Sequence, residues 1–145
     1  MKRVHVAIMR KSWGLTQKIL TGEKTVESRW YINKYRPWDQ ISTGETIYFK
    51  DSGEPVTVKA EVNKVEQYAD LDQAKREWLL KKYSVSDLGT KEIMPQILEY
   101  IKNKRYCIII HLRNPKEVDP FEIDKSGFGA MASWLTVDRI EEVKR

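Results

Sequence analysis

The stretch TGEKTVESRWY, residues 21–31, joins the end of one predicted element to the start of another. Apolar residues at helical spacing predict a helix from about Ser12 to Thr21, and Gly22 is the type of residue that ends a helix. Thr25 to about Ile32 is rich in β-branched and aromatic residues, which favours a strand. The stretch therefore sets where a helix gives way to a strand, and it places charged side chains next to that turn.

Lys24, Glu27 and Arg29 of this stretch are close enough in sequence to form one site. The two-residue period of a strand places Glu27 and Arg29 on one face, together with Thr25 and Tyr31. Lys24 falls on the opposite face unless the preceding turn leaves it outside the regular pleat. In that case its ammonium can reach the carboxylate of Glu27.

Such a trio suits two tasks. For binding, Arg29 offers a planar fork to a phosphate or a base edge, and Lys24 supplies a point charge. For catalysis, a desolvated Lys24 beside Glu27 would serve as base or nucleophile. The alternative is a salt-bridge cluster that only stabilises the edge of a sheet.

The rest of the chain predicts further strands broken by one helical segment. Strands are expected at residues 3–9, 46–50, 56–62, 106–112 and 134–140, and helices at residues 70–82 and 90–104. The pairing of 46–50 with 56–62 in a hairpin is the clearest local contact. The pattern predicts a single α+β domain over residues 1–145: a small, mostly antiparallel β-barrel with a short N-terminal helix and a helical insertion at about 70–104.

The charge is unevenly distributed. The net charge is +5, and residues 1–60 hold 11 Lys and Arg against 6 Asp and Glu, whereas residues 61–145 hold 15 of each. A basic region is typical of proteins with a polyanionic partner, although Lys-rich surfaces also serve solubility. The sequence contains no apolar run of membrane-spanning length, no signal-peptide pattern and a single cysteine, so we expect a cytoplasmic protein without a membrane partner.

Several common site types are missing from the sequence. It contains no glycine-rich phosphate loop and no G-x-S-x-G motif. His5 and His111 lie in separate predicted strands and belong to no metal-spaced cluster. We therefore expect neither a metal nor another cofactor.

Gly22, Lys24, Glu27 and Arg29 fit the motif G-x-K-x-x-E-x-R. With its context "ILTGEKTVESR" and the later "TGETIYF", this motif resembles the ASCH domain family, a branch of the PUA-like β-barrel superfamily. The resemblance implies a PUA-like barrel whose cleft, at Lys24, Glu27 and Arg29, binds RNA or a nucleotide base.

The same resemblance also leaves an enzyme open. Some small ASCH proteins are amidohydrolases of acylated cytidine nucleosides, and at least one branch is reported as a ribonuclease. The hydrolases carry Thr where this chain has Glu27, and they use a Lys with a later Glu. Glu77 is the nearest later acid by position.

Aromatic and basic residues alternate around the motif, a combination that suits single-stranded nucleic acid because bases stack on rings while cations hold the backbone. The candidate ligand-binding residues beyond the motif are Arg10, Lys11, Trp13, Tyr31, Lys34, Arg36 and Trp38. Trp38, in a polar loop, is the best candidate for an exposed stacking ring, whereas Trp78, on a helical stripe, is predicted to pack in the core. Ser133 and Trp134 follow a loop of small residues and are predicted to end the cleft wall. The alternative is that the Trp residues only fill the core.

The sequence thus supports a leading hypothesis and two others. The first is a metal-independent module that binds RNA or a nucleotide in a basic, aromatic-flanked cleft. The second is a hydrolase, either an acylcytidine amidohydrolase or a metal-independent ribonuclease, with Lys24 and Glu27 as its catalytic pair. The third is a protein-interaction role for the helical segment at 70–104. Whether the chain is an enzyme stays open at this point.

Overall fold

The computed structural model describes residues 2–145, which form a six-stranded sheet with three α-helices and two short 3-10 helices. The strands are β1 (Val4–Met9), β2 (Val26–Tyr31), β3 (Thr46–Asp51), β4 (Val56–Tyr68), β5 (Tyr106–Phe121) and β6 (Trp134–Val137). The helices are η1 (Lys11–Trp13), α1 (Leu15–Thr21), α2 (Gln73–Leu88), α3 (Pro95–Ile101) and η2 (Ile140–Glu142).

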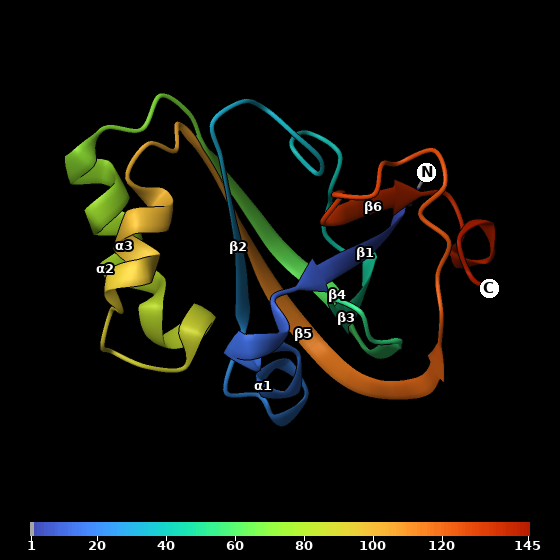
Figure 1. The fold of residues 1–145 in the computed structure, drawn as a ribbon. Coiled ribbons are helices and arrows are strands. Elements are labelled where there is room, and N and C mark those ends of the chain that lie inside the picture. The colour runs from blue at the N-terminus through green and yellow to red at the C-terminus, as the bar shows by residue number, and fades with distance from the viewer. Residues whose placement is uncertain (1) are drawn as a thin grey trace.

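The sheet has the order β2-β5-β4-β3-β1-β6, with β1 and β3 parallel and every other pair antiparallel. It curls into a half-barrel, and α2 and α3 lie together beside β2 and β5 (Figure 1). The predicted α+β, mostly antiparallel architecture is confirmed. The predicted hairpin is confirmed as well, because β3 pairs with β4 in the expected antiparallel register.

β5 is much longer than the predicted strand at 106–112. The sequence prediction ended there because Pro115 lacks the N–H that a central strand needs. In the structure, Asn114 and Pro115 together stand opposite the single residue Ala60 of β4, and Asn114 has a positive φ of 53°. This bulge lets β5 pass the proline and continue along β4.

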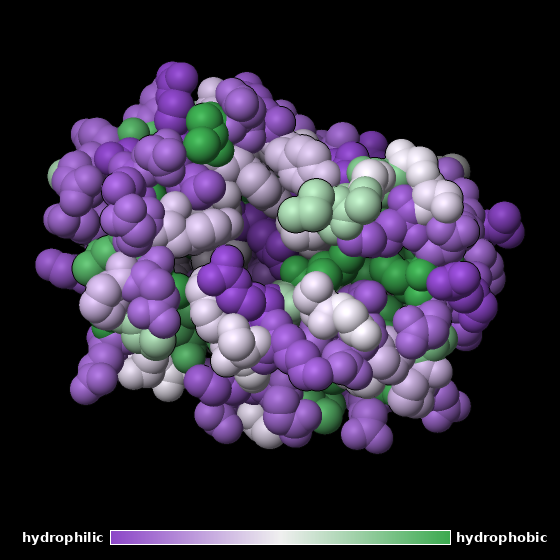
Figure 2. Space-filling view, viewed as in Figure 1, coloured by the Kyte–Doolittle hydropathy of each residue, from purple (hydrophilic) through white to green (hydrophobic). Residues whose placement is uncertain are grey.

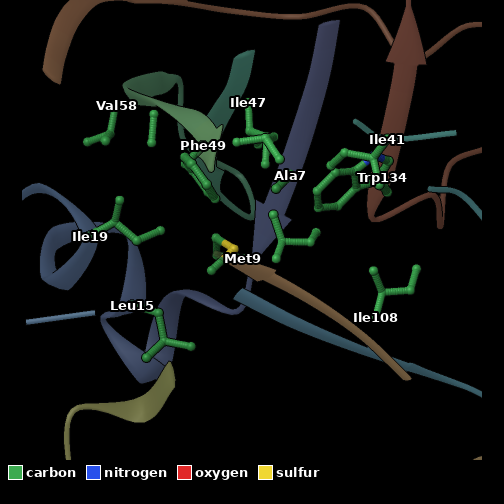
Figure 3. Packing of buried hydrophobic residues seen from close by; sticks show 13 residues of the cluster. Ala7, Met9, Leu15, Ile19, Ile41, Ile47, Phe49, Val58, Ile108 and Trp134 are labelled. Carbon is green, nitrogen blue, oxygen red and sulfur yellow. The ribbon is translucent and has the colours of Figure 1, made fainter. Parts of the chain in front are cut away.

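The sheet takes part in three hydrophobic clusters, and two of them adjoin β2 and β5. Inside the half-barrel, Met9 of β1 and Phe49 of β3 pack with Trp134 of β6, and α1 adds Leu15 (Figure 3). On the other face, β2 and β5 pack against the helical insertion through Val26, Trp30, Cys107, Ile109, Leu79, Leu80, Tyr83, Ile97 and Ile101. Because β5 alternates between the two clusters, the predicted buried strand is confirmed.

The helices differ from their predicted bounds for local reasons. The segment predicted as one helix at 12–21 is divided by Gly14, which adopts φ +62° between η1 and α1, and Gly22 ends α1 as predicted. The side chain of Asp72 caps the N-terminus of α2 through a 2.8 Å bond from the Lys75 N–H, and α2 continues to Leu88 rather than ending near residue 82. Pro95 opens α3, so this helix starts later than predicted.

The prediction that Trp78 packs in the core is wrong. Its side chain is 45% exposed, because the buried face of α2 is formed instead by Leu79, Leu80 and Tyr83. No helix among residues 2–145 is long and apolar enough to cross a membrane.

His5 of β1 is completely buried between Glu45 and Trp134. The Trp134 indole N–H donates to His5 Nδ1 over 3.1 Å, so His5 carries its proton on Nε2 and donates it to Glu45 Oε1 over 2.8 Å. Burial lowers the pKa of His5 and outweighs the opposite effect of Glu45. The folded protein therefore holds this ring neutral.

We predict that the free energy of unfolding falls as the pH drops below about 6.5, the usual pKa of histidine. The unfolded chain takes up a proton there that the folded chain does not, so stability is lost as pH falls. Urea unfolding between about pH 7.5 and 5 measures this slope. His5→Gln should flatten it, whereas His111→Gln should leave the His5 contribution in place. A wild-type slope retained in His5→Gln would contradict the assignment.

Candidate functional site

The turn between α1 and β2 directs Lys24 into the protein. The N–H of Lys24 donates to Lys18 O over 3.0 Å, and the N–H of Thr25 donates to Ser86 O over 2.8 Å. Lys24 thus precedes the regular pleat of β2, and only 1% of it is exposed. Of the two placements that the sequence left open, the one with the contact forms, since Lys24 Nζ lies 2.9 Å from Glu27 Oε1.

The Lys24 ammonium is surrounded by acceptors. It donates to Val26 O over 2.6 Å and to Asp87 O over 2.7 Å, and it also contacts Asp87 Oδ1 and Glu27 Oε1. An ammonium carries three hydrogens, and four oxygens share them here. Lys24 therefore has no hydrogen left to offer a ligand.

Asp87 is the acid that the sequence analysis missed. It lies in the last turn of α2, where its second carboxylate oxygen accepts from the Ser28 hydroxyl, and Trp30 Nε1 in turn donates to Ser28 Oγ over 3.0 Å. Glu77, the nearest later acid by position, is exposed on α2 and accepts from Gln73.

A signal for Asp87 was present in the sequence. An acidic residue in the last turn of a helix opposes the helix dipole, and local choices that conflict with the fold often mark functional sites. This signal can be used only when the end of the helix is known. The predicted helix ends near residue 82, which places Asp87 in a loop.

Arg29 extends the network to the other end of the sheet. Its Nε and one terminal nitrogen, Nη2, each lie 2.8 Å from Glu27 Oε2. Its Nη1 donates to Ser133 O over 3.2 Å, and its Nη2 donates to Ile8 O over 3.4 Å. The guanidinium also lies over the Trp134 ring, 5.1 Å from the centroid. Since β2 lies at one end of the sheet and β1 and β6 lie at the other, Arg29 links the two edges of the half-barrel.

The charges determine which group can exchange a proton. Burial lowers the pKa of Lys24, but the nearby charges of Asp87 and Glu27 outweigh burial and raise it overall. Burial raises the pKa of Glu27, but Lys24 and Arg29 reverse the shift and lower it. Burial raises the pKa of Asp87, and the like charge of Glu27 adds to that, so this pKa stays raised despite Lys24. Lys24 and Glu27 therefore keep their charges. Of the two carboxylates, that of Asp87 accepts a proton more readily than that of Glu27.

A pocket of about 500 Å³ opens beside this network, between the half-barrel and the helical insertion. Its polar lining includes Glu27, Ser28, Arg29 and Asp87 beside the network, and its aromatic lining is formed by Trp13, Trp30 and Tyr100. The space-filling view shows a hollow with hydrophilic residues at its bottom, near the middle of the face (Figure 2). Met131, which is 94% exposed, also borders the pocket. Lys24 does not line the pocket but holds the two carboxylates that do.

The structure brings together one part of the predicted set of site residues. Arg10, Trp13, Glu27, Arg29 and Ser133 line the pocket, and Lys24 touches Glu27 from within. Four further lining residues were not predicted from the sequence to belong to the site: Ser28, Trp30, Asp87 and Tyr100. Among residues 2–145, no three His, Cys, Asp or Glu side chains gather as a group that could hold a metal ion.

The other predicted residues lie away from the pocket lining. Lys11 is exposed and pairs with Glu54 over 2.6 Å, and Trp134 is buried beneath Arg29. Trp38 is half-buried, with its ring edge-on to Tyr106 at 5.3 Å. The remaining three are placed near these: Tyr31 donates to Arg36 O, Arg36 Nε donates to Trp134 O, and Lys34 lies over the Trp38 ring. Their roles in binding stay predictions.

Comparison with solved structures finds the same fold in another protein. The crystal structure of an ASCH protein from Zymomonas mobilis matches with a TM-score of 0.68 at 18% sequence identity, over 96% of this chain and 90% of that one. A Tyr-to-Phe variant of it matches with a TM-score of 0.67 at 18% identity, over 96% and 92%. A Ser-to-Ala variant matches with a TM-score of 0.68 at 17% identity, over 96% and 90%. The chain therefore has the ASCH fold, as its motif predicted. Comparisons with protein-family models and with curated proteins find no match.

We predict that Lys24→Met lowers the free energy of unfolding by about 3–5 kcal/mol at pH 7, because it leaves two buried carboxylates without their shared cation. The loss should shrink at acidic pH, where a proton can replace the ammonium. Urea unfolding at both pH values measures it.

The matched control is Lys11→Met, which removes an exposed ion pair and should leave stability nearly unchanged. Equal effects of the two substitutions would show that the buried network is not what stabilises this region.

Proposed function

We propose that the chain binds RNA, or a single nucleotide, in the pocket beside β2. The observation that carries the proposal is the composition of this pocket, in which aromatic rings lie next to fixed, charged hydrogen-bonding groups. Trp13 and Tyr100 offer surfaces against which a base can stack, and Glu27 and Arg29 offer an acceptor and a donor. The shared ASCH fold is consistent with a partner of this kind.

The size of the pocket suits one nucleotide. Pockets for small molecules usually measure about 300–1,000 Å³, and this one is about 500 Å³. Stacking on an aromatic side chain contributes roughly 1–3 kcal/mol per base. A single well-placed ring can therefore account for a tenfold change in affinity.

The charge pattern indicates which edge of the ligand faces β2. The carboxylates of Glu27 and Asp87 accept hydrogen bonds, so they favour a base edge that carries N–H groups. The basic side chains of Arg10 and Lys125, which also line the pocket, are suited to a phosphate. We infer a nucleotide orientation with the base toward β2 and the phosphate toward these cations.

Binding is favoured over catalysis by Lys24. Its ammonium is buried, shared among four oxygens and held charged, whereas a catalytic base or nucleophile needs a free, neutral amine. The pairing of Lys24 with Glu27 therefore supports a positioning role for Lys24.

A hydrolase is the second candidate because of Asp87. Asp87 lines the pocket, contacts the Ser28 hydroxyl and has a raised pKa, as expected for a group that accepts a proton during a reaction. Under this alternative, an acylcytidine amidohydrolase or a metal-independent ribonuclease would use Asp87, rather than Lys24, for proton transfer.

We predict that Trp13→Ala weakens binding of a labelled nucleotide or short single-stranded RNA by about 5- to 150-fold, the equivalent of about 1–3 kcal/mol of stacking. Fluorescence titration at about 20 mM salt measures the change, and the affinity of wild type for the RNA should fall with added salt. Met94→Ala, which removes an exposed apolar side chain outside the pocket lining, is the control and should bind as wild type does. No binding of wild type to any nucleotide or RNA at low salt would refute the proposal.

The hydrolase candidate predicts that the protein forms products, which can be measured separately from ligand binding. Incubation with acylated cytidines and with RNA should yield products with wild type, and Asp87→Asn should lower the turnover rate far more than it weakens ligand binding. Circular dichroism confirms that the variant is folded. The absence of products from all substrates, with ligand binding intact, would leave binding as the function.

A further inference from the structure

Trp78 is exposed on a face of α2 that does not belong to the pocket. Trp78 is 45% exposed on α2, although a Trp side chain buries one of the largest apolar areas when it is covered. Leu80 and Asp87, which line the pocket, lie about 160–180° around the helix from Trp78 at 100° per residue. Trp78 therefore faces away from the pocket.

Two lysines lie against the Trp78 ring. The Nζ atoms of Lys75 and Lys82 are 4.1 and 4.8 Å from its centroid. Tyr68, at the end of β4, stands edge-on to Trp78 at 6.5 Å and lies 5.0 Å from Lys75 Nζ. We call Tyr68, Lys75, Trp78 and Lys82 the α2 stripe. It combines two rings with two cations in one continuous surface.

The acids near the stripe do not cancel its charge. Glu66 accepts from the hydroxyls of Tyr68 and Tyr83 and contacts His111 Nε2, each at 2.6 Å, and only 16% of its side chain is exposed. These contacts lower its pKa to about 2 against the opposing effect of burial, so it stays ionised and already accepts from three groups. Glu77 lies about 100° around α2 from Trp78 and accepts from Gln73. The two lysines of the stripe are not ion-paired to either acid.

We propose that the α2 stripe is a second contact surface for single-stranded RNA, with a base stacked on Trp78 and phosphates held by Lys75 and Lys82. The choice of partner rests on the proposed function, and charge complementarity supports it: the stripe is cationic and carries an exposed ring, the pairing that single-stranded nucleic acid requires. An apolar protein partner would have to desolvate two ammonium groups to reach the indole, which disfavours it.

The two surfaces can be tested separately because one nucleotide cannot reach both. Trp78 lies on the side of α2 opposite Leu80 and Asp87, which line the pocket, so the helix, about 10–12 Å across with its side chains, stands between the two surfaces. A mononucleotide therefore reports on the pocket, whereas a longer strand of RNA can engage the stripe as well.

The experiment measures binding of a labelled single-stranded 12-nucleotide RNA and of a mononucleotide across a salt series. Trp78→Ala should weaken binding of the RNA by about 5-fold or more, the lower limit for loss of one stacked base. Lys75→Ala with Lys82→Ala should reduce the slope of log affinity against log salt by about 1.4, at about 0.7 per phosphate contact. Mononucleotide binding should be unchanged in both variants.

The control is Lys59→Ala with Lys116→Ala, which removes the same charge from a pair of residues facing each other on β4 and β5. This pair is nine residues from Tyr68 along β4, or about 30 Å. If the stripe variants bind the RNA with the affinity and salt slope of this control, the inference is overturned, whatever happens at the pocket.

The remaining outcomes separate the two proposals. RNA binding that depends on Trp78, in a protein that binds no mononucleotide, would support the stripe and count against the pocket. Failure of wild type to bind the RNA at about 20 mM salt would overturn the stripe.

Discussion

The buried ammonium of Lys24 is the constraint on which the rest of the site depends. Placing an ion in the protein interior costs several kcal/mol unless it is fully paired, and Lys24 recovers this through both Glu27 and Asp87. Those contacts join the start of β2 to the last turn of α2, and so set how the helical insertion sits on the sheet. Arg29 continues the network from Glu27 to the backbone of Ile8 and Ser133, at the other edge of the half-barrel.

This arrangement gives the pocket charged walls that are held before any ligand arrives. Glu27 is fixed by two cations, and Asp87 is fixed by Lys24 and the Ser28 hydroxyl. Preorganised groups of this kind raise affinity because less ordering is required on binding. Lys24 is buried behind this wall, where it holds the carboxylates of Glu27 and Asp87 in place. Lys24, Glu27 and Arg29 of the motif therefore form a buried network that fixes the charged wall of the pocket.

Local sequence patterns predicted the order and type of most helices and strands. They did not predict which residues far apart in the sequence come into contact. The helix stop at Gly22 and the strand after it depend on neighbouring residues and were predictable, whereas the contact of Lys24 with Glu27 depended on a turn geometry that the sequence left open. Asp87 is 63 residues from Lys24, and its role appears only when α2 packs on β2. The exposure of Trp78 is similar, because its helical spacing was compatible with burial and only the tertiary packing of α2 decided which face turned inward. β5 continues beyond its predicted end at residue 112 because a bulge accommodates Pro115.

The most direct test of the central claim is a crystal structure of the protein soaked with nucleoside monophosphates. We expect the base of the nucleotide to lie against the aromatic side chains of the pocket, with its N–H edge on Glu27. The phosphate of the nucleotide should lie near Arg10 or Lys125. Lys24 should keep its contacts with both carboxylates in that complex. A nucleotide bound elsewhere on the protein, with the pocket filled only by water, would contradict the account.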